Sequence, residues 1–434
     1  VANHLWGNNG KPSLPSGLPD SELAQNFSDF FTNKIDAIRK KLQSQTRRDT
    51  YLSDADSSVT EPLVEFTPTT VEELEAIIRK APNKSCELDS IPTWLLKQCL
   101  TELLPLITNI VNRSMETSYV PKDFKSAHIR PLLRKPGLDA DTYKNYRPVS
   151  NLPFISKILE KVVDKRIEQH LACNSLHEAK QSAYRKFHST ETALLKVQSD
   201  ILHSLDQGDV SVLVMLDLSA AFDTIDHQTL LNRLEYELGI QEKVVAWMAS
   251  YLSDRYQTVC VNDKLSTPVL LEYSVPQGSV LGPKYFVMYT KPLGKILARH
   301  GLSYHFYADD TQLYLSFKPT DRIAQQDALS RIEQCLAEIE AWMHDNMLKL
   351  NTDKTEVILF TSRNNTRHLD SVSVTVGESV IRSTDCVRNL GVMFDSTMSM
   401  QQQVKALCRA GYAQLRNIGR VRRYLTSDAC KSLV

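Results

Sequence analysis

The sequence predicts an α+β protein in which short strands alternate with longer amphipathic helices. The 434-residue chain is 42% hydrophobic and 24% charged, which is typical of a globular protein with a substantial core. From about residue 92 onward, helical and strand-like periodicities alternate without a long linker. Asp309 and Asp310 separate two apolar runs, which is typical of a β-hairpin with an acidic tip.

The first 80 residues are predicted to form a linker and a helical region, partly disordered. Residues 1–20 are rich in Asn, Gly, Pro and Ser, as flexible linkers are. A helix is expected over 21–42, with Asp20 or Ser21 as its cap. The polar segment 46–60 is expected to be loose, and a further helix is expected after a cap at Thr70.

Beyond residue 80 we expect one multi-lobed module of helices and short strands. Helices are predicted over 93–117, 156–171, 189–206, 229–238, 241–252 and 321–347. Strands are predicted over 210–216, 257–261, 303–307, 311–317 and 356–360. The last helix has apolar residues at steps of three and four, so one of its faces is expected to pack on the core.

Positive and negative charges balance, with 51 Lys plus Arg and 51 Asp plus Glu, which argues against a histone-like polycation. The charges are nevertheless segregated. The segment 51–80 has seven acidic and two basic residues, whereas 404–434 has seven basic residues and one acidic residue. Clustered positive charge indicates a polyanionic partner, although a solvated face is the commoner explanation.

No apolar run approaches the roughly 18 residues of a membrane span, so no membrane partner is expected. The eight cysteines are scattered without a CxxC pair or a His at zinc-ligand spacing. We expect most of them to be buried thiols in a reducing, intracellular compartment. The chain begins with Val1 and ends inside a helical pattern, which indicates a fragment of a longer polypeptide.

Three carboxylates stand out by their positions. Asp217 interrupts an apolar strand, where an acid is costly to bury without a cation or hydrogen bonds. Asp309 and Asp310 fill the expected hairpin tip, although such a pair alone is also typical of an ordinary turn. If the strand end lies beside the hairpin, the repulsion among the three is tolerable only around divalent cations. Oxygen ligands favour Mg²⁺, and paired ions of this kind serve phosphoryl transfer, so the pattern predicts nucleotidyl transfer.

Five sequence blocks follow one another in the order found in reverse transcriptases. They are LDLSAAFDTIDH (216–227), VPQGSVLGP (275–283), FYADDTQLY (306–314), LNTDKTEVILF (350–360) and NLGVMFD (389–395). NYRPVSNLPFISKILEKVV (145–163) and QSAYRKFHST (181–190) resemble fingers motifs of the non-LTR, LINE-type branch. The chain therefore resembles reverse transcriptases of non-LTR retrotransposons of the Jockey and chicken-repeat type, from about residue 27 to the end.

This resemblance implies a right-hand polymerase with fingers, a palm whose antiparallel sheet packs on helices, and a partial thumb. Fingers and palm would occupy 81–395, with a core at 122–395, and a truncated helical thumb would occupy 396–434. The implied activity is RNA-directed DNA polymerisation with two Mg²⁺ ions, or Mn²⁺ in their place. The implied partners are an RNA template, a DNA primer at the chromosomal target, dNTPs, and an endonuclease domain in the same polypeptide. Assembly with RNA in the cytoplasm and action in the nucleus are also implied.

The resemblance implies roles for single residues as well. Asp217, Asp309 and Asp310 match the catalytic, metal-binding triad, and the backbone carbonyl of Leu218 matches an additional ligand. Phe222 matches the bulky residue that would clash with a 2′-hydroxyl and so favour dNTPs. Ordinary core packing is the alternative explanation for Phe222.

Other matches concern the nucleotide and the leaving group. Gln277 and Gly278 match the motif beside nucleotide and template, where Gly278 allows a close backbone approach. Arg147 and Lys135 match fingers residues that grip the triphosphate, although each is also typical of a surface cation. Lys354 matches the lysine proposed as the general acid for pyrophosphate. A solvated lysine near the start of a strand is the alternative.

The chain departs from the family pattern at several positions. Glu87, Ser90 and Ala183 stand where the family has glycine, and Lys284 stands where it has an apolar residue. These departures leave open a decayed or co-opted copy that binds RNA and is catalytically weak. A two-metal nuclease is a third hypothesis, which Phe222 disfavours because a nuclease needs no sugar gate.

Overall fold

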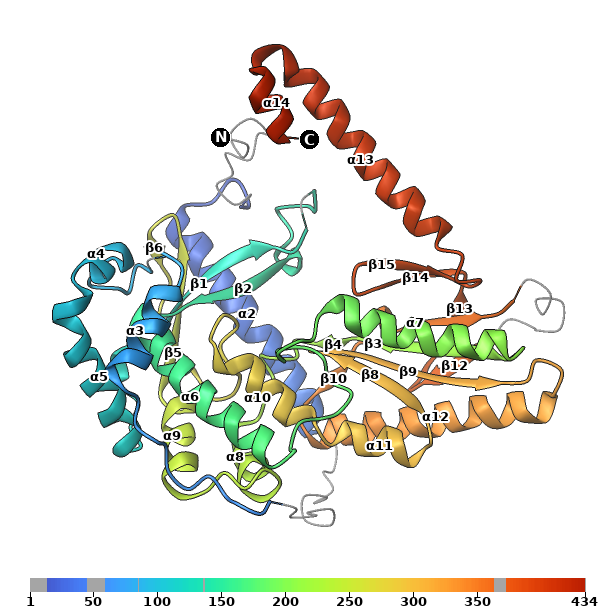
Figure 1. Ribbon diagram of the computed structural model, residues 1–434, viewed down its shortest axis with the longest axis horizontal. Helices are drawn as coiled ribbons and strands as arrows, with labels where there is room; N and C mark the ends of the chain where they lie inside the picture. The colour runs from blue at the N-terminus through green and yellow to red at the C-terminus, as the bar shows by residue number, and fades with distance from the viewer. Residues whose placement is uncertain (1–13, 45–58, 85, 136, 363–371, 434) are drawn as a thin grey trace.

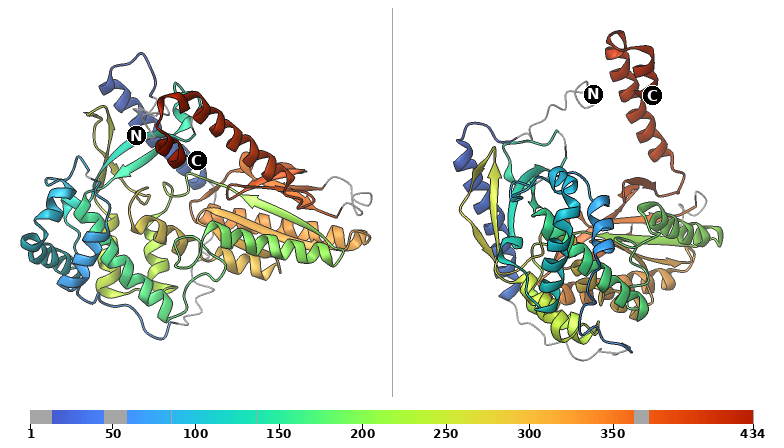
Figure 2. Two further views of the ribbon diagram at one scale, coloured as in Figure 1. Left: turned by 45° about the horizontal axis from the view of Figure 1, so that its top comes forward. Right: turned by 60° about the vertical axis from the view of Figure 1, so that its left-hand side comes forward.

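The computed structural model describes residues 14–44, 59–84, 86–135, 137–362 and 372–433. Most of the expected linker and of the expected loose segment 46–60 lies outside these ranges. Within them the chain has the predicted α+β fold, in which a six-stranded and a five-stranded sheet pack against helices (Figure 1, Figure 2).

The six-stranded sheet has the order β12-β13-β11-β3-β9-β8. Its strands are β3 (Val210–Leu216), β8 (Ser303–Tyr307), β9 (Asp310–Phe317), β11 (Glu356–Phe360), β12 (Ser373–Val376) and β13 (Ser379–Thr384). Neighbours are antiparallel except β11 and β13. Both faces of central β3 are covered, since Leu213 and Val214 belong to two different core clusters. This explains the almost continuous apolar run of β3.

Helices cover the two faces of this sheet (Figure 1). One face is packed with α7 (Thr190–Asp206), which begins at a capping box between Ser189 and Thr192. The other is packed with α12 (Arg322–Asp345), whose N-terminus is capped by Asp321. The same large core includes α8 (His227–Tyr236), α9 (Glu242–Leu252), α10 (Leu281–Thr290) and α11 (Leu293–Arg299).

The five-stranded sheet has the order β2-β1-β5-β6, with β7 also paired to β5. Its strands are β1 (Ser126–Leu133), β2 (Tyr146–Asn151), β5 (Arg255–Val261), β6 (Lys264–Leu265) and β7 (Val269–Leu271). Sequence analysis missed β1 and β2 because each contains a proline, and Pro131 and Pro148 face each other in register. The pairing of β1 with β5 ends at Ile129. Pro131 therefore has no second neighbouring strand to which a backbone N–H would have to donate, and proline lacks that group.

An N-terminal helix, α2 (Asp20–Gln43), packs along the five-stranded sheet (Figure 1). Its buried apolar side chains, Leu23, Phe27 and Phe31 among them, share a core with this sheet. The predicted cap was wrong, because Asp20 already lies in the first turn and no side chain caps the helix. This helix therefore belongs to the folded body of the protein.

The remaining N-terminal helices are α3 (Val71–Lys80), α4 (Thr93–Gln98), α5 (Leu100–Glu116) and α6 (Phe154–Cys173). The cap predicted for α3 is confirmed, since the Thr70 side chain accepts the backbone N–H of Glu73. The helix expected over 93–117 is interrupted, because Cys99 has φ −95° and ψ 24°, outside the helical region.

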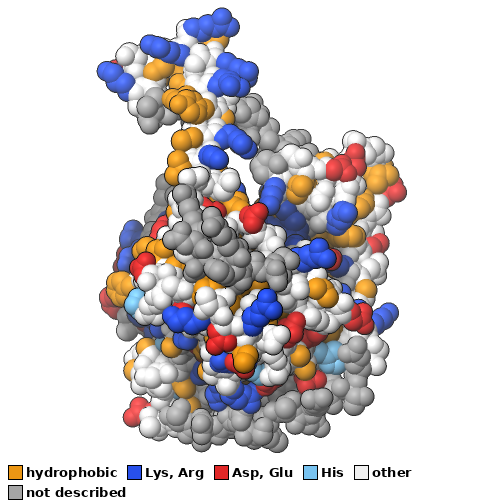
Figure 3. Space-filling view, turned by 90° about the vertical axis from the view of Figure 1, so that its right-hand side faces the viewer, with side chains coloured by type: hydrophobic (Ala, Val, Ile, Leu, Met, Phe, Trp, Pro, Cys, Tyr) orange, Lys and Arg blue, Asp and Glu red, His pale blue; other side chains and the backbone are white. Residues whose placement is uncertain are grey.

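At the C-terminus, the hairpin of β14 (Cys386–Asn389) and β15 (Val392–Asp395) is followed by α13 (Gln401–Val421) and α14 (Ser427–Leu433). Leu390 and Gly391 both have positive φ, as a tight hairpin turn requires. Helix α13 projects away from the body and buries no residue (Figure 1). Lys and Arg side chains gather with apolar ones on this projection (Figure 3).

The thiols and the helices also bear on cellular context. All eight cysteines lie in described residues and none forms a disulfide. The expectation that most are buried was wrong: Cys260 and Cys335 are buried, and the other six are partly or fully exposed. None of the described helices has an apolar stretch long enough to span a bilayer.

Candidate active site

The end of β3 and the β8–β9 turn meet at one edge of the six-stranded sheet. Leu216 lies opposite Thr311 in the antiparallel register, so the next residue, Asp217, follows across from Asp310. Asp309 belongs to the two-residue turn between the paired Tyr307 and Asp310. The three acidic residues that the sequence singled out thus lie at the same edge.

Their charges act on one another. Desolvation, followed by the charges of Asp309 and Asp217, raises the pKa of Asp310 to about 6. Desolvation and the charge of Asp217 also raise the pKa of Asp309. An unperturbed aspartate has a pKa of about 3.9, so this edge of the sheet disfavours negative charge unless a cation is close.

Asp217 has two further partners from the segment that follows β10. Strand β4 (Leu218–Ser219) pairs with β10 (Lys349–Leu350), which brings this segment alongside. One carboxylate oxygen of Asp217 accepts hydrogen bonds from Asn351 Nδ2 at 2.9 Å and from Lys354 Nζ at 3.1 Å. The N–H of Asn351 also donates to the carbonyl of Asp217 at 2.9 Å. Sequence analysis missed Asn351, whose only signal was its place in the block that contains Lys354.

The donor set suits a hard divalent cation. Asp217, Asp309 and Asp310 offer only oxygen atoms, which Mg²⁺ prefers, and a cation would relieve their repulsion. Over the described ranges, no three His, Cys, Asp or Glu side chains are already arranged as metal ligands. In this structure Asp217 is hydrogen-bonded to Asn351 and Lys354. The residues present fit magnesium by their chemistry.

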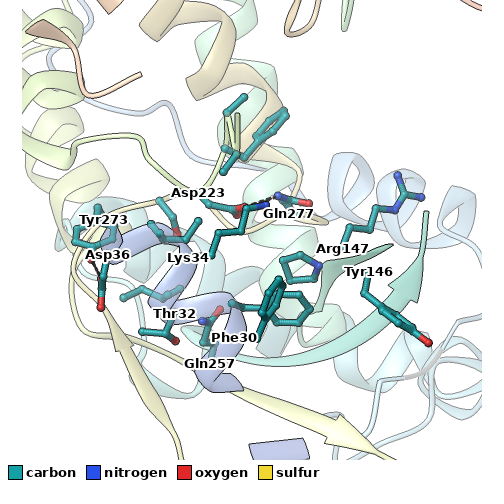
Figure 4. A pocket seen from close by; sticks show the side chains of 18 of the residues that line it. Phe30, Thr32, Lys34, Asp36, Tyr146, Arg147, Asp223, Gln257, Tyr273 and Gln277 are labelled. Atoms are coloured by element: carbon teal, nitrogen blue, oxygen red, sulfur yellow. Dashed lines mark hydrogen bonds between the residues drawn. The ribbon is translucent and has the colours of Figure 1, made fainter. Parts of the chain in front are cut away.

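A cavity of about 560 Å³ opens at this edge, between both sheets and α2 (Figure 4). Most of the predicted site residues line it, namely Arg147, Asp217, Leu218, Phe222, Gln277, Asp309 and Lys354. Three predicted residues, Lys135, Gly278 and Asp310, are not among the described residues of the wall. Two cations that sequence analysis did not single out, Lys34 and Arg134, belong to it.

Gln277 joins the two sides of the cavity. Its Nε2 donates to both carboxylate oxygens of Asp223, at 3.0 and 3.1 Å (Figure 4). Its backbone carbonyl accepts the N–H of Ser150 in β2 at 2.7 Å. Burial raises the pKa of Asp223 to about 6, and the amide of Gln277 opposes this shift. Asp223 was not predicted, because the family match of its motif assigns roles to Asp217 and Phe222 and none to Asp223.

Phe222 packs on the core and also lies in the cavity wall. Its ring lies against that of Phe286, with centroids 4.9 Å apart, and it packs on the main core. It also lines the cavity next to the carboxylates. The packing with Phe286 would hold the Phe222 ring in place at the cavity wall.

Gln181 holds the turn that contains Asp309. Its Oε1 accepts the N–H of Ala308 at 3.1 Å, and its Nε2 donates to the Ala308 carbonyl at 3.3 Å. Ala308 has φ 57°, a conformation that is uncommon for alanine and needs support from its surroundings. Gln181 lies in the QSAYR block, but nothing in the sequence pointed to Ala308 as its partner.

The departures from the family pattern are accommodated locally. Ala183 and Ser90 do not have positive φ, so a side chain at either position adds no backbone strain. Lys284 forms ion pairs with Glu168 and, at 3.9 Å, with Asp164. These substitutions therefore provide no structural sign of a disrupted fold.

The β14–β15 hairpin is anchored close to the carboxylates. Asn389, in the block that matches the primer grip, donates from Nδ2 to Oε1 of Gln312 at 2.6 Å, and both side chains are buried. Gln312 lies two residues after Asp310 on β9. The hydrogen bond therefore fixes the hairpin to the strand that begins with Asp310.

Clustered carboxylates at the end of a central antiparallel strand, beside a cavity with cations on its wall, are an arrangement suited to metal-assisted nucleotidyl transfer. A family model described as "Reverse transcriptase (RNA-dependent DNA polymerase)" matches residues 133–394. The chain belongs to this family and contains an RNA-directed DNA polymerase domain.

Several curated proteins of non-LTR retrotransposons are similar to the chain. It is 26% identical over 417 residues to the "Probable RNA-directed DNA polymerase from transposon BS" of Drosophila melanogaster, covering 93% of this chain and 45% of that protein. It is 27% identical over 346 residues to the RNA-directed DNA polymerase from mobile element jockey of Drosophila funebris, covering 78% of this chain and 36% of that protein. The chain thus spans less than half the length of these relatives.

Replacing Gly278 with alanine is expected to destabilise the contact between Gln277 and β2. Gly278 has φ +122°, and an added Cβ would lie 2.5 Å from the carbonyl oxygen of Ser150. We expect Gly278→Ala to lower the free energy of unfolding by about 1–3 kcal/mol, measured by urea denaturation.

Gly411→Ala is the matched control, because Gly411 lies in a helix with no atom within 4 Å of the added Cβ. It should leave stability unchanged or raise it by up to about 1 kcal/mol. Equal effects of the two substitutions would contradict the close approach at Gly278.

Proposed function

We propose that this chain polymerises DNA on an RNA template in target-primed reverse transcription of a non-LTR retrotransposon. The observation that carries the proposal is the β3–β9 register, which sets Asp217, a residue of the cavity wall, across from Asp310. A nucleotide in that cavity would contact Phe222 and Gln277 as well as the carboxylates.

Asp217, Asp309 and Asp310, with the carbonyl of Leu218, would hold two Mg²⁺ ions, which Mn²⁺ could replace. When bound, such ions activate the attacking primer 3′-hydroxyl and stabilise the leaving pyrophosphate. Lys354 lies 3.1 Å from Asp217 and extends into solvent at the cavity wall, so it can supply a proton to the leaving group.

The remaining residues would bind and select the nucleotide. Phe222, held by Phe286, would exclude a 2′-hydroxyl, and Gln277 would contact the nucleotide while Gly278 lets its loop approach β2. Arg147 would grip the triphosphate with its planar guanidinium. Lys135 lies in the connection between β1 and β2 and would act from outside the cavity wall.

In this proposal residues 81–395 are fingers and palm, and 396–434 begin a thumb that follows the nucleic-acid backbone. The basic residues on the projecting α13 and α14 support that role (Figure 3). The partners would be an RNA template and nicked chromosomal DNA, cut by an endonuclease domain of the same parent polypeptide. The complex with RNA would assemble in the cytoplasm and act in the nucleus.

Replacing Asp309 with asparagine is expected to abolish primer extension. The change removes one negative charge from the carboxylate cluster, so extension of oligo(dT) on poly(rA) with Mg²⁺ should fall at least about a hundredfold. Affinity for the RNA, measured by fluorescence anisotropy, should be largely unchanged.

Asp263→Asn, at an exposed turn between β5 and β6, controls for loss of a surface charge and should extend normally. Extension that survives Asp309→Asn would refute the assignment of the site. A wild-type chain that binds RNA but does not extend, even with the rest of the thumb added, would favour the decayed or co-opted copy.

Replacing Phe222 with valine is expected to admit ribonucleotides. A smaller side chain leaves space for a 2′-hydroxyl, so the ratio of rNTP to dNTP incorporation should rise at least about tenfold. Phe286→Leu removes the ring beneath Phe222 without altering the residues that line the cavity. It should lower the melting temperature and raise the rNTP to dNTP ratio less than Phe222→Val does, because the Phe222 ring is still present. An unchanged ratio in Phe222→Val would show that Phe222 only packs.

A further inference from the structure

Lys34, on α2, lies in the wall of the active-site cavity. It shares this wall with Asp217 and Asp309 of the carboxylate cluster and with Phe222 and Gln277. Figure 4 shows its side chain rising from the helix toward the Asp223–Gln277 hydrogen bond. A residue more than 180 positions before the first catalytic carboxylate therefore reaches the proposed nucleotide site.

Charges of both signs surround Lys34 in the cavity wall. Burial, and then the charge of Arg134, lowers the pKa of Lys34, and Lys354 adds to this effect while Asp223 opposes it. Among the described residues Lys34 has no hydrogen bond or ion pair, although its ammonium group has three donors. Of the carboxylates in the same wall, Asp217 and Asp309 would be neutralised by the proposed metal ions, and Asp223 is hydrogen-bonded to Gln277. Lys34, Arg134 and Arg147 are then available to bind a polyanion.

Helix α2 holds Lys34 at a defined position. One turn further along, Arg39 donates to Asp226 at 2.9 Å and to the carbonyl of Thr224 at 3.1 Å. Arg39 also lies over the ring of Tyr273, at 4.1 Å from its centroid, and Tyr273 is hydrogen-bonded to Asp36. These contacts connect α2 to the segment that follows Asp217, so Lys34 can act as a preorganised contact.

We propose that Lys34 binds the triphosphate of the incoming dNTP, together with Arg134 and Arg147. This inference rests on the proposed polymerase function, which it extends to a helix outside the fingers and palm. The triphosphate is favoured over the template backbone because Lys34 shares the cavity wall with Phe222 and Gln277. An exposed basic surface such as that of α13 suits a backbone better.

The test measures nucleotide binding without chemistry. The full 434-residue chain is mixed with an RNA template and a DNA primer that ends in a dideoxynucleotide, and the ternary complex formed with dTTP and Mg²⁺ is titrated. The variants are Lys34→Met, which keeps length but not charge, and Lys34→Arg, which keeps the charge. Lys40→Met, an exposed lysine of the same helix, is the matched control.

We expect Lys34→Met to raise the dTTP concentration for half-saturation at least about tenfold, the loss expected for a charged hydrogen bond. Its affinity for primer–template without dTTP should stay within about twofold of wild type, and Lys34→Arg should recover most of the loss. Lys40→Met should bind dTTP as wild type does. This pattern would support the proposal.

Unchanged dTTP binding in Lys34→Met would overturn the proposal. An equal loss of primer–template affinity would also overturn it, since Lys34 would then contact the nucleic-acid backbone. A wild-type chain that forms the ternary complex but fails to extend an ordinary primer would count against the polymerase function alone, and the Lys34 comparison would still decide this inference.

Discussion

The antiparallel register of β3 and β9 determines where the acidic residues of this protein lie together. With Leu216 opposite Thr311, Asp217 follows across from Asp310. A slip of one residue would turn the side chains of β9 to the other face of the sheet. Such a slip is opposed because Leu313 of β9 packs in the main core, whereas Tyr314 packs in a second core and donates a hydrogen bond to Asp200. An apolar sheet thus fixes acidic groups whose mutual repulsion opposes their assembly.

The cavity depends on three parts of the chain that are distant in sequence. The six-stranded sheet supplies the carboxylates, the β1–β2 pair supplies cations, and α2 forms a further part of the wall. Hydrogen bonds join these parts. Gln277 connects β2 to Asp223, and Arg39 connects α2 to Asp226. Helix α2 and the β1–β2 pair share one core, whereas the six-stranded sheet packs in two others. These hydrogen bonds therefore connect separately packed parts around one cavity.

The acidic edge of the sheet could be predicted from the sequence, whereas much of the cavity wall could not be predicted. An apolar run interrupted by Asp217, and an alternating hairpin around Asp309, have clear local signals. The pair of β1 and β2 has none, since proline lowers the strand signal of both. Lys34 lies on a helix whose periodicity shows which face is buried, but not which neighbour meets that face. The motif match predicts Lys135, whereas the adjacent Arg134 lines the cavity. A motif match does not resolve which of two neighbouring side chains faces inward.

A titration of the 434-residue chain with Mn²⁺ tests most directly whether Asp217, Asp309 and Asp310 form a cation site. The electron paramagnetic resonance signal reports the concentration of the free ion. Wild type should bind Mn²⁺ saturably, and Asp217→Asn and Asp310→Asn should each weaken binding at least about tenfold, since each removes a ligand. The exposed variant Asp263→Asn should bind as wild type does. Equal affinity in wild type and all variants would contradict the assignment of this acidic edge as the metal site.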